Sequence, residues 1–240
     1  MKLPSFFKKR NQSLSGTDET GRGTLNFWLD IGLNLVIIIG LVFLIRTYVI
    51  SPFQVYGPSM CDTLNAEKGE CGRGYGEYII VNKFGYLNIL GWQVGLPERG
   101  DIIVFHPPHN DKEFYIKRVI GMPGETVELI DGYVFIKNTE NPDGIRVEEP
   151  YLNEDNLGNT HPMTGTRVFN VPANSYFVMG DNRLKSSDAR SCFSETFIHK
   201  ECGEEGTSYF LTQKNIEGKA MVILWPLNKI SLITDTAYAL

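Results

Sequence analysis

The sequence has few of the side chains that build metal sites, and its main body has no excess of positive charge. It holds 4 cysteines and 4 histidines in 240 residues. No C-x-x-C or H-E-x-x-H spacing, the patterns typical of zinc sites, occurs among them. Residues 51–240 carry 17 Lys and Arg against 25 Asp and Glu, whereas nucleic-acid binding rewards clustered basic side chains. We therefore expect no metal, no cofactor and no nucleic-acid partner.

The longest hydrophobic run lies near the N-terminus, in residues 27–45, where Asp30 and Asn34 are the only strongly polar side chains. A helix of this length reaches roughly 28 Å, close to the thickness of the hydrocarbon core of a bilayer. A cleaved secretory signal and a buried core helix are the alternatives. The run is longer than most signal-peptide cores, and no small-x-small cleavage site follows it. We predict a transmembrane anchor over residues 27–49.

The charges around this run predict its orientation. The first 26 residues hold five basic side chains against two acidic ones. Because positively charged flanks stay in the cytoplasm, we expect residues 1–26 to form a basic cytoplasmic tail. Residues 50–240 then form an extracytoplasmic domain of a single-pass protein in the plasma (inner) membrane.

The four cysteines form two sequence pairs, Cys61 with Cys71 and Cys192 with Cys202, each separated by ten positions. An even number of cysteines in an oxidising compartment favours disulfides, although four cysteines allow three connectivities. Cys192–Cys202 is the favoured pair, as a clip on one loop, and Cys61–Cys71 is the second candidate. Free buried thiols remain the alternative.

Short β-branched runs bounded by turn residues dominate the chain after residue 50, and no clear amphipathic helix occurs there. The runs are residues 78–81, 101–105, 114–120, 126–136, 176–179 and 220–225. Asp131-Gly132 is a strong hairpin signal within one of them. Residues 138–172 are polar and rich in Asn, Gly and Pro, and we expect them to form a loop or a small excursion from the main domain. We expect residues 203–218 to form an irregular insert. We predict a mainly β protein, with a single N-terminal transmembrane helix before an extracytoplasmic all-β domain.

Three segments contain candidate catalytic residues. Residues 114–120 (FYIKRVI) read as an apolar strand with a cation on each face. A buried arginine stays charged and needs a partner, whereas a buried lysine can lose its proton and act as a base. An exposed lysine on an edge strand is the alternative for Lys117.

Ser59 lies in the second segment, QVYGPSMCDTL (residues 54–64). Gly57 and Pro58 impose a tight backbone approach that can present a hydroxyl and its own N–H to a carbonyl. The third segment, GDNRLKSSDAR (residues 180–190), crowds acids, arginines and serines into a turn after a strand. Such pairing can rigidify a loop, and a serine there can hold a lysine amine in place.

Together these segments resemble the type I signal peptidases, the S26 family of bacterial leader peptidases that cleave with a Ser/Lys dyad. Residues 55–64 match the family pattern V-x-G-x-S-M-x-P-T-L except at the proline, where Asp62 stands. The resemblance continues through YIIVNKF (78–84), RGD (99–101), YIKRVIGMPGE (115–125), GDNR (180–183), GKA (218–220) and WP (225–226).

The resemblance implies a serine endopeptidase that removes signal peptides from exported preproteins after small residues, in an Ala-x-Ala pattern and through an acyl-enzyme. It implies Ser59 as the nucleophile, Lys117 as the general base and Ser186 as the group that orients the amine. The remaining implied residues shape the site (Asp181, Asp188, Arg190) or line the substrate pocket (Gly57, Met60, Tyr115, Ile116). The implied partners are signal peptides and the lipid bilayer.

Two other functions stay open at this point. A self-cleaving repressor-type peptidase has similar Ser/Lys chemistry, but such proteins are cytosolic, and the hydrophobic run at residues 27–45 speaks against that. An anchored β domain that binds cell-wall or peptide ligands without catalysis would make Lys117 merely structural. A Ser-His-Asp triad is not favoured, because no catalytic motif surrounds any histidine.

Overall fold

A computed structural model of the chain describes residues 18–67, 70–86, 88–89, 92–193, 202 and 208–234. The chain divides into two compact units, residues 1–45 and 46–240. Most of the predicted basic tail, residues 1–17, lies outside the described residues. So do residues 194–201 and 203–207, around and within the predicted irregular insert.

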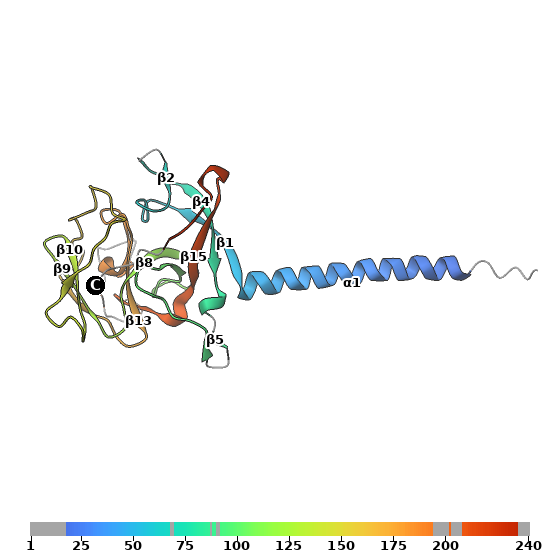
Figure 1. Ribbon diagram of the computed structural model, residues 1–240, viewed down its shortest axis with the longest axis horizontal. Coiled ribbons are helices and arrows are strands. Elements are labelled where there is room, and N and C mark those ends of the chain that lie inside the picture. The colour runs from blue at the N-terminus through green and yellow to red at the C-terminus, as the bar shows by residue number, and fades with distance from the viewer. Residues whose placement is uncertain are drawn as a thin grey trace, which may run out of the picture. The chain divides into compact units, whose positions relative to one another are not determined.

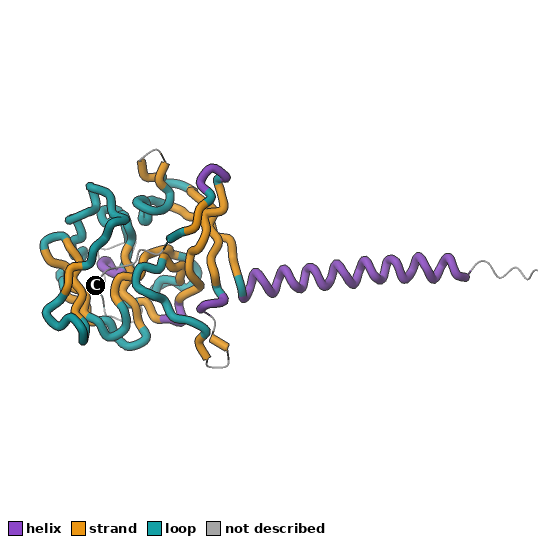
Figure 2. The backbone as a smooth tube through the Cα atoms, viewed as in Figure 1, coloured by secondary structure: helices purple, strands orange, loops and turns teal. Residues whose placement is uncertain are grey.

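The described part of the first unit is helical. This helix, α1, spans Asp18–Tyr48, and its stretch Phe27–Tyr48 is long and apolar enough to cross a membrane (Figure 2). None of the most apolar part of this stretch is buried inside the protein. Apolar side chains on all sides of a helix suit it to a lipid environment.

The second unit is mainly β (Figure 1). Its largest sheet is antiparallel throughout and has the strand order β1-β4-β15-β7-β8-β13-β14, with β16 also paired to β15. These strands are β1 (Ile50–Tyr56), β4 (Tyr75–Asn82), β7 (Ile102–Phe105), β8 (Tyr115–Gly121), β13 (Ser175–Met179), β14 (Leu211–Thr212), β15 (Ile216–Trp225) and β16 (Ser231–Leu232).

A second antiparallel sheet has the order β11-β10-β9-β12. Its strands are β9 (Thr126–Ile130), β10 (Tyr133–Lys137), β11 (Ile145–Arg146) and β12 (Val168–Asn170). Asp131 and Gly132 join β9 to β10 with φ values of 49° and 84°, as a two-residue type I′ turn requires. The smaller elements are β2 (Ala66–Glu67), β3 (Glu70–Cys71), β5 (Asn88–Ile89), β6 (Trp92–Gln93) and 3-10 turns at Phe84–Tyr86, Ala189–Ser191, Gln213–Asn215 and Leu227–Lys229.

Two hydrophobic cores hold the second unit together. The larger one joins residues of the main sheet, such as Phe105 and Phe177, with residues of the second sheet, such as Val127 and Val134. The smaller core lies beneath the segment that carries Ser59; its buried members are Val55, Met60, Leu64, Ile79, Val81, Ile102, Val104 and Ala220. The mainly β fold is therefore confirmed.

The short strands β2, β3, β5, β6, β11, β12, β14 and β16 lie outside the predicted runs, and two longer strands also depart from the sequence prediction. Strand β1 was not predicted at all, because Pro52 interrupts its pattern; a proline is tolerated there because β1 ends the strand order of its sheet. Strand β15 begins at Ile216 rather than at residue 220, so the predicted irregular insert is wrong over residues 216–218. The polar side chains of Glu217 and Lys219 are satisfied in the strand by ion pairs to Lys83 and Asp101.

Candidate active site

Ser59 lies in the turn that follows β1, and the backbone before it is fixed from both sides. Gly57 has a φ of 80°, a conformation that favours glycine, and its N–H donates to Gly74 O at 3.0 Å. The Cys61 N–H donates to Pro58 O at 3.1 Å and closes the turn. The nucleophile candidate is therefore presented on a short, tightly bonded turn.

Buried Asn65 holds the same segment together from within. Its Nδ2 donates to the carbonyl oxygens of Gly57 at 2.9 Å, Gly72 at 3.1 Å and Gly74 at 3.1 Å. The disulfide Cys61–Cys71 ties the two ends of this segment covalently. The other predicted pair, Cys192–Cys202, is bonded as well, so the alternative of free thiols is wrong.

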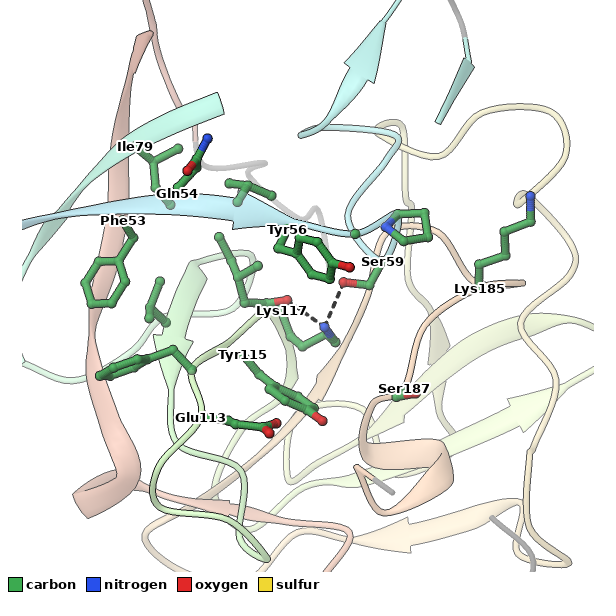
Figure 3. Close-up of a pocket in the computed structure, with 16 residues that line it drawn as sticks. Phe53, Gln54, Tyr56, Ser59, Ile79, Glu113, Tyr115, Lys117, Lys185 and Ser187 are labelled. Carbon is green, nitrogen blue, oxygen red and sulfur yellow. Dashed lines mark hydrogen bonds between the residues drawn. The ribbon is translucent and has the colours of Figure 1, made fainter. Parts of the chain in front are cut away.

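Lys117 reaches Ser59 from β8. Its Nζ lies 2.9 Å from Ser59 Oγ and donates to Ile116 O at 2.8 Å (Figure 3). The side chain is 3% exposed, and β8 lies between β7 and β13, so the alternative of an exposed lysine on an edge strand is wrong. A neutral amine has one lone pair, which can accept the Ser59 O–H while its own N–H donates to the carbonyl.

The surroundings of Lys117 favour the neutral amine. Burial lowers the pKa of Lys117 from 10.5 to about 8, although the negative charges of Asp188 and Asp181 act in the opposite direction. Desolvation dominates because neither carboxylate forms an ion pair with this amine among the described residues, whereas a buried ammonium loses its hydration.

A groove of about 530 Å³ opens over the two side chains. One wall is β1 with the turn after it, and the other is residues 113–117 at the start of β8. Gly57, Tyr115 and Ile116 line it as the sequence predicted. Met60 does not line it; its side chain is 1% exposed and packs into the smaller core. The apolar Met60 side chain turns inward, where it removes hydrophobic surface from water.

Behind the groove, Asp181 pairs with Arg118. Arg118 donates from Nε to Asp181 Oδ1 at 2.8 Å and from Nη2 to Asp181 Oδ2 at 2.6 Å. It also donates to Gly100 O at 2.9 Å and Thr63 Oγ1 at 3.1 Å. Both partners are almost completely buried, so this bidentate pair fixes β8 to the segment after β13.

Asp188 and Arg190 form a second buried pair, at 2.9 Å. Burial alone would raise the pKa of Asp188, but Arg190, the Gly180 N–H and the Ser186 hydroxyl together hold that pKa below its usual value. Ser186 Oγ is buried and makes no hydrogen bond of good geometry with the described residues, Lys117 included. It lies against Gly180, where a Cβ would overlap both Ser186 Oγ and Ser59 O. Ser186 is therefore packed beside the backbone of Ser59.

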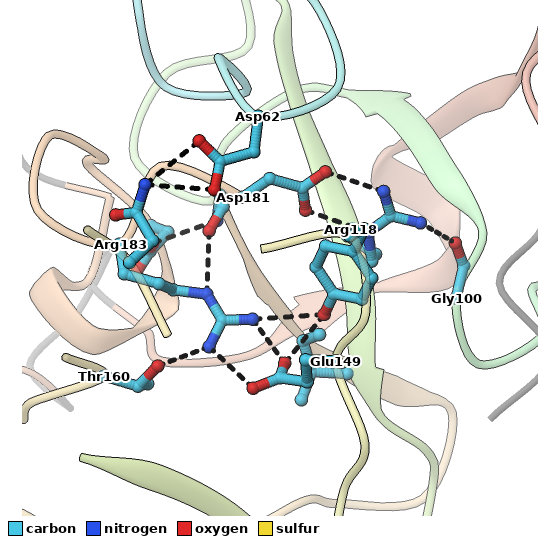
Figure 4. Close-up of polar contacts among 12 residues, drawn as sticks. Asp62, Gly100, Arg118, Glu149, Thr160, Asp181 and Arg183 are labelled. Atoms are coloured by element: carbon cyan, nitrogen blue, oxygen red, sulfur yellow. Dashed lines mark hydrogen bonds and ion pairs between the residues drawn. The ribbon is translucent and has the colours of Figure 1, made fainter. Parts of the chain in front are cut away.

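A third buried pair was missed by the sequence analysis. Arg183 binds Glu149, and it also donates to Thr160 Oγ1 and to Tyr151 OH, the latter at 3.1 Å (Figure 4). Burial opposes the charged guanidinium, but the Glu149 carboxylate outweighs it and raises the pKa of Arg183. Glu149 lies 34 residues before Arg183 in the sequence, and no local pattern marks the pair.

Asp62, which stands at the family's proline position, is also engaged. Its carboxylate accepts from the Asn153 N–H at 2.8 Å and from Asn156 Nδ2 at 3.0 Å. Asn156 Oδ1 in turn accepts from the Leu184 N–H at 3.2 Å. The two asparagines therefore join the turn of Ser59 to the segment that carries Ser186.

Comparisons with known proteins identify the family of this chain. Residues 28–225 match the family described as "Signal peptidase, peptidase S26". The chain belongs to this family. It is 36% identical to signal peptidase I T of Bacillus subtilis over 183 residues, which cover 74% of the chain and 82% of that protein. It is 30% identical to a signal peptidase I of Pseudomonas aeruginosa over 228 residues, 85% of the chain and 75% of that protein.

A crystal structure of a signal peptidase I from Enterococcus faecalis is 32% identical; it matches 52% of this chain and 96% of its own, with a TM-score of 0.35. Family membership makes this chain a serine peptidase of the kind that removes signal peptides from preproteins. The apolar helix near its N-terminus fits a membrane-anchored enzyme. No group of three or more His, Cys, Asp or Glu side chains able to hold a metal occurs among the residues described.

Proposed function

We propose that this S26 peptidase cleaves preproteins after small residues of the Ala-x-Ala type, with Ser59 as nucleophile and Lys117 as general base. The observation that carries the proposal is the 2.9 Å contact between Lys117 Nζ and Ser59 Oγ, made by an amine whose pKa is lowered to about 8 by burial. A base with a pKa near the working pH combines a useful neutral fraction with real basicity.

The chemistry follows from these two groups. Ser59 Oγ attacks the scissile carbonyl while Lys117 Nζ takes its proton. The tetrahedral intermediate collapses, the proton passes to the leaving amine of the mature chain, and the signal peptide stays as an ester on Ser59. Water, deprotonated by the same amine, then hydrolyses the ester and restores the hydroxyl.

The developing oxyanion needs a donor close to Ser59. The Ser59 backbone N–H has no acceptor among the described residues, and such a donor is typically worth a few kcal/mol in the transition state. The Ser59 carbonyl accepts from the Asn182 N–H at 3.1 Å, which helps to fix the peptide plane that follows. Ser186 then supports the nucleophile, because it packs beside the backbone of Ser59; Asp181, Asp188 and Arg190 hold the surrounding backbone in place.

The groove suits an extended peptide that ends in small side chains. It lies between the terminal strand β1 and the start of β8, so backbone groups at its walls can pair with a substrate strand. Gly57, Tyr115 and Ile116 line the part nearest Ser59. In this proposal residues 27–49 cross the plasma membrane and residues 1–26 stay in the cytoplasm. Residues 50–240 then meet signal peptides at the outer surface of the bilayer.

The test uses the full-length enzyme in lipid vesicles and a precursor with alanine at the two positions expected to be small. We expect Ser59→Ala and Lys117→Ala each to reduce cleavage at least about 10³-fold, with normal expression and membrane insertion. Thr126→Ala, a change of a small hydroxyl residue on the exposed side of the second sheet, is the control and retains activity. Cleavage within tenfold of wild type by either dyad variant contradicts the proposal.

A further inference from the structure

Two side chains of opposite charge, Glu113 and Lys185, line the groove at separate places. Glu113 lies next to Tyr115 where the β8 wall begins, whereas Lys185 lies with Ser187 beyond Ser59 (Figure 3). Both charged side chains are exposed. In the described part of the chain Lys185 forms no ion pair. Because the Lys185 side chain is exposed and lines the groove, its ammonium can contact a substrate.

The backbone of Lys185 is tied to the reaction centre. The Lys185 N–H donates to Asn182 O at 3.2 Å, and the Asn182 N–H donates to Ser59 O at 3.1 Å. Two hydrogen bonds thus link the backbone of Ser59 to the backbone of Lys185. The ammonium itself sits on a flexible four-carbon stem, so its charge covers a zone just beyond Ser59.

The proposed function gives a bound substrate its direction. In the proposed function, the residues before the scissile bond lie along β1 and against Ile116. The chain after the scissile bond then leaves past Ser59 on the side where Lys185 and Ser187 lie (Figure 3). The first residues of the mature protein therefore pass the lysine.

We propose that Lys185 selects acidic side chains at the first positions of the mature chain. The inference rests on the proposed function, because the substrate direction comes from it. An exposed ion pair changes an equilibrium by about 1.4- to 5-fold, so the preference is a modest one. Salt reduces it, because charges exposed to water are screened over about 10 Å at 0.1 M ionic strength.

The experiment compares three precursors that are identical up to the cleavage site and carry two Glu, two Gln or two Lys residues directly after it. For the full-length enzyme in vesicles of neutral lipid at low salt, we expect kcat/KM to be about threefold or more higher for the Glu precursor than for the Lys precursor. In Lys185→Gln this ratio falls to about one, and in Lys185→Glu it inverts.

Lys214→Gln removes the same charge from an exposed lysine that does not line the groove, and it keeps the wild-type ratio. A ratio that is equal in the wild type and both Lys185 variants overturns the inference. If that happens while cleavage still depends on Ser59, the proposed function stands. If cleavage of all three precursors survives Ser59→Ala, the proposed function itself has failed.

Discussion

Lys117 and Arg118 are neighbours on β8 and are 3% and 1% exposed, yet their surroundings differ completely. Lys117 points to the groove and meets a hydroxyl and a carbonyl. Arg118 points to the opposite side of the strand and meets the two oxygens of Asp181. On the groove side an amine can lose its proton, whereas on the other side a guanidinium keeps its charge and needs a carboxylate. The type of side chain and its partner together therefore decide whether a buried cation keeps its charge.

The same contrast holds for the wider site. Three buried arginines behind the groove each have their own carboxylate: Arg118 with Asp181, Arg183 with Glu149, and Arg190 with Asp188. Buried ion pairs contribute little net stability but cost much when one partner is removed. We infer that these three ion pairs form a rigid frame behind the groove. On the groove side, Lys117 has no ion pair among the described residues, so its amine can lose its proton and act as a base.

The largest effect on cleavage is expected when Lys117 is replaced by arginine, the type of cation found at position 118. Lys117→Arg places a permanently charged group beside Ser59, so no base remains. We expect kcat/KM for precursor cleavage to fall about 10³-fold or more. Lys214→Arg, at an exposed position, is the matched control and keeps full activity. Turnover within tenfold of wild type would show that residue 117 is not the base.

The second effect, on stability, is expected when the ion pair between Arg118 and Asp181 is broken. Asp181→Asn removes the carboxylate that pairs with the buried charge of Arg118, and we expect a loss of about 3–5 kcal/mol in the free energy of unfolding. Urea denaturation of the full-length chain in detergent, followed by tryptophan fluorescence, measures it. Adding Arg118→Met to this variant should restore part of the loss. A single-variant loss below about 1 kcal/mol would mean that the pair behaves like an exposed one.

Removing the cation on the groove side, Lys117, is expected to raise the free energy of unfolding instead of lowering it. The pKa of Lys117 is lowered from 10.5 to about 8, so the folded state binds fewer protons than the unfolded state between these values. Stability therefore rises with pH across this window, and the full cost, about 3 kcal/mol, applies below it. Lys117→Met should stabilise the protein by about this amount at pH 7 while abolishing cleavage. Denaturation of wild type and Lys117→Met at pH 7 and above pH 10 measures the difference in stability where the unfolded lysine is charged and where it is neutral. If Lys117→Met is less stable than wild type at pH 7, the lowered pKa of Lys117 is contradicted.

The pH dependence of the rate tests the same amine. Because Lys117 must be neutral to act as a base and its pKa lies at about 8, kcat/KM should fall about tenfold per pH unit well below this value and level off above it. The precursor assay at constant ionic strength gives the profile. A flat profile from about pH 6 to 8 would exclude a lysine base with this pKa.

The smallest effect concerns the link between the two segments. Asn156→Ala removes the hydrogen bonds that join Asp62 to Leu184, and we expect a loss of about 1–2 kcal/mol in stability with a lower kcat. Asn170→Ala, on the exposed edge of β12, is the matched control. If kcat is unchanged, the frame positions the nucleophile turn without help from Asp62.

Much of the fold could be predicted because its signals are local. The apolar run at residues 27–45, the Asp131-Gly132 turn and the β-branched runs each carry their structure within a few residues. Strand β1 was missed because Pro52 breaks its pattern, and its place at the end of the sheet is a property of the whole fold. Met60 was placed in the pocket because its position in a motif does not say which way its side chain turns.

By itself the sequence determined the type of protein: the apolar helix, the β-rich body and the residue types of a Ser/Lys site are present in short strings. Only the tertiary structure brought Lys117 to Ser59 across 58 positions and gave each arginine its carboxylate. The pKa of an amine depends on burial and on the distance to every charge around it. Those quantities exist only once the strands have packed.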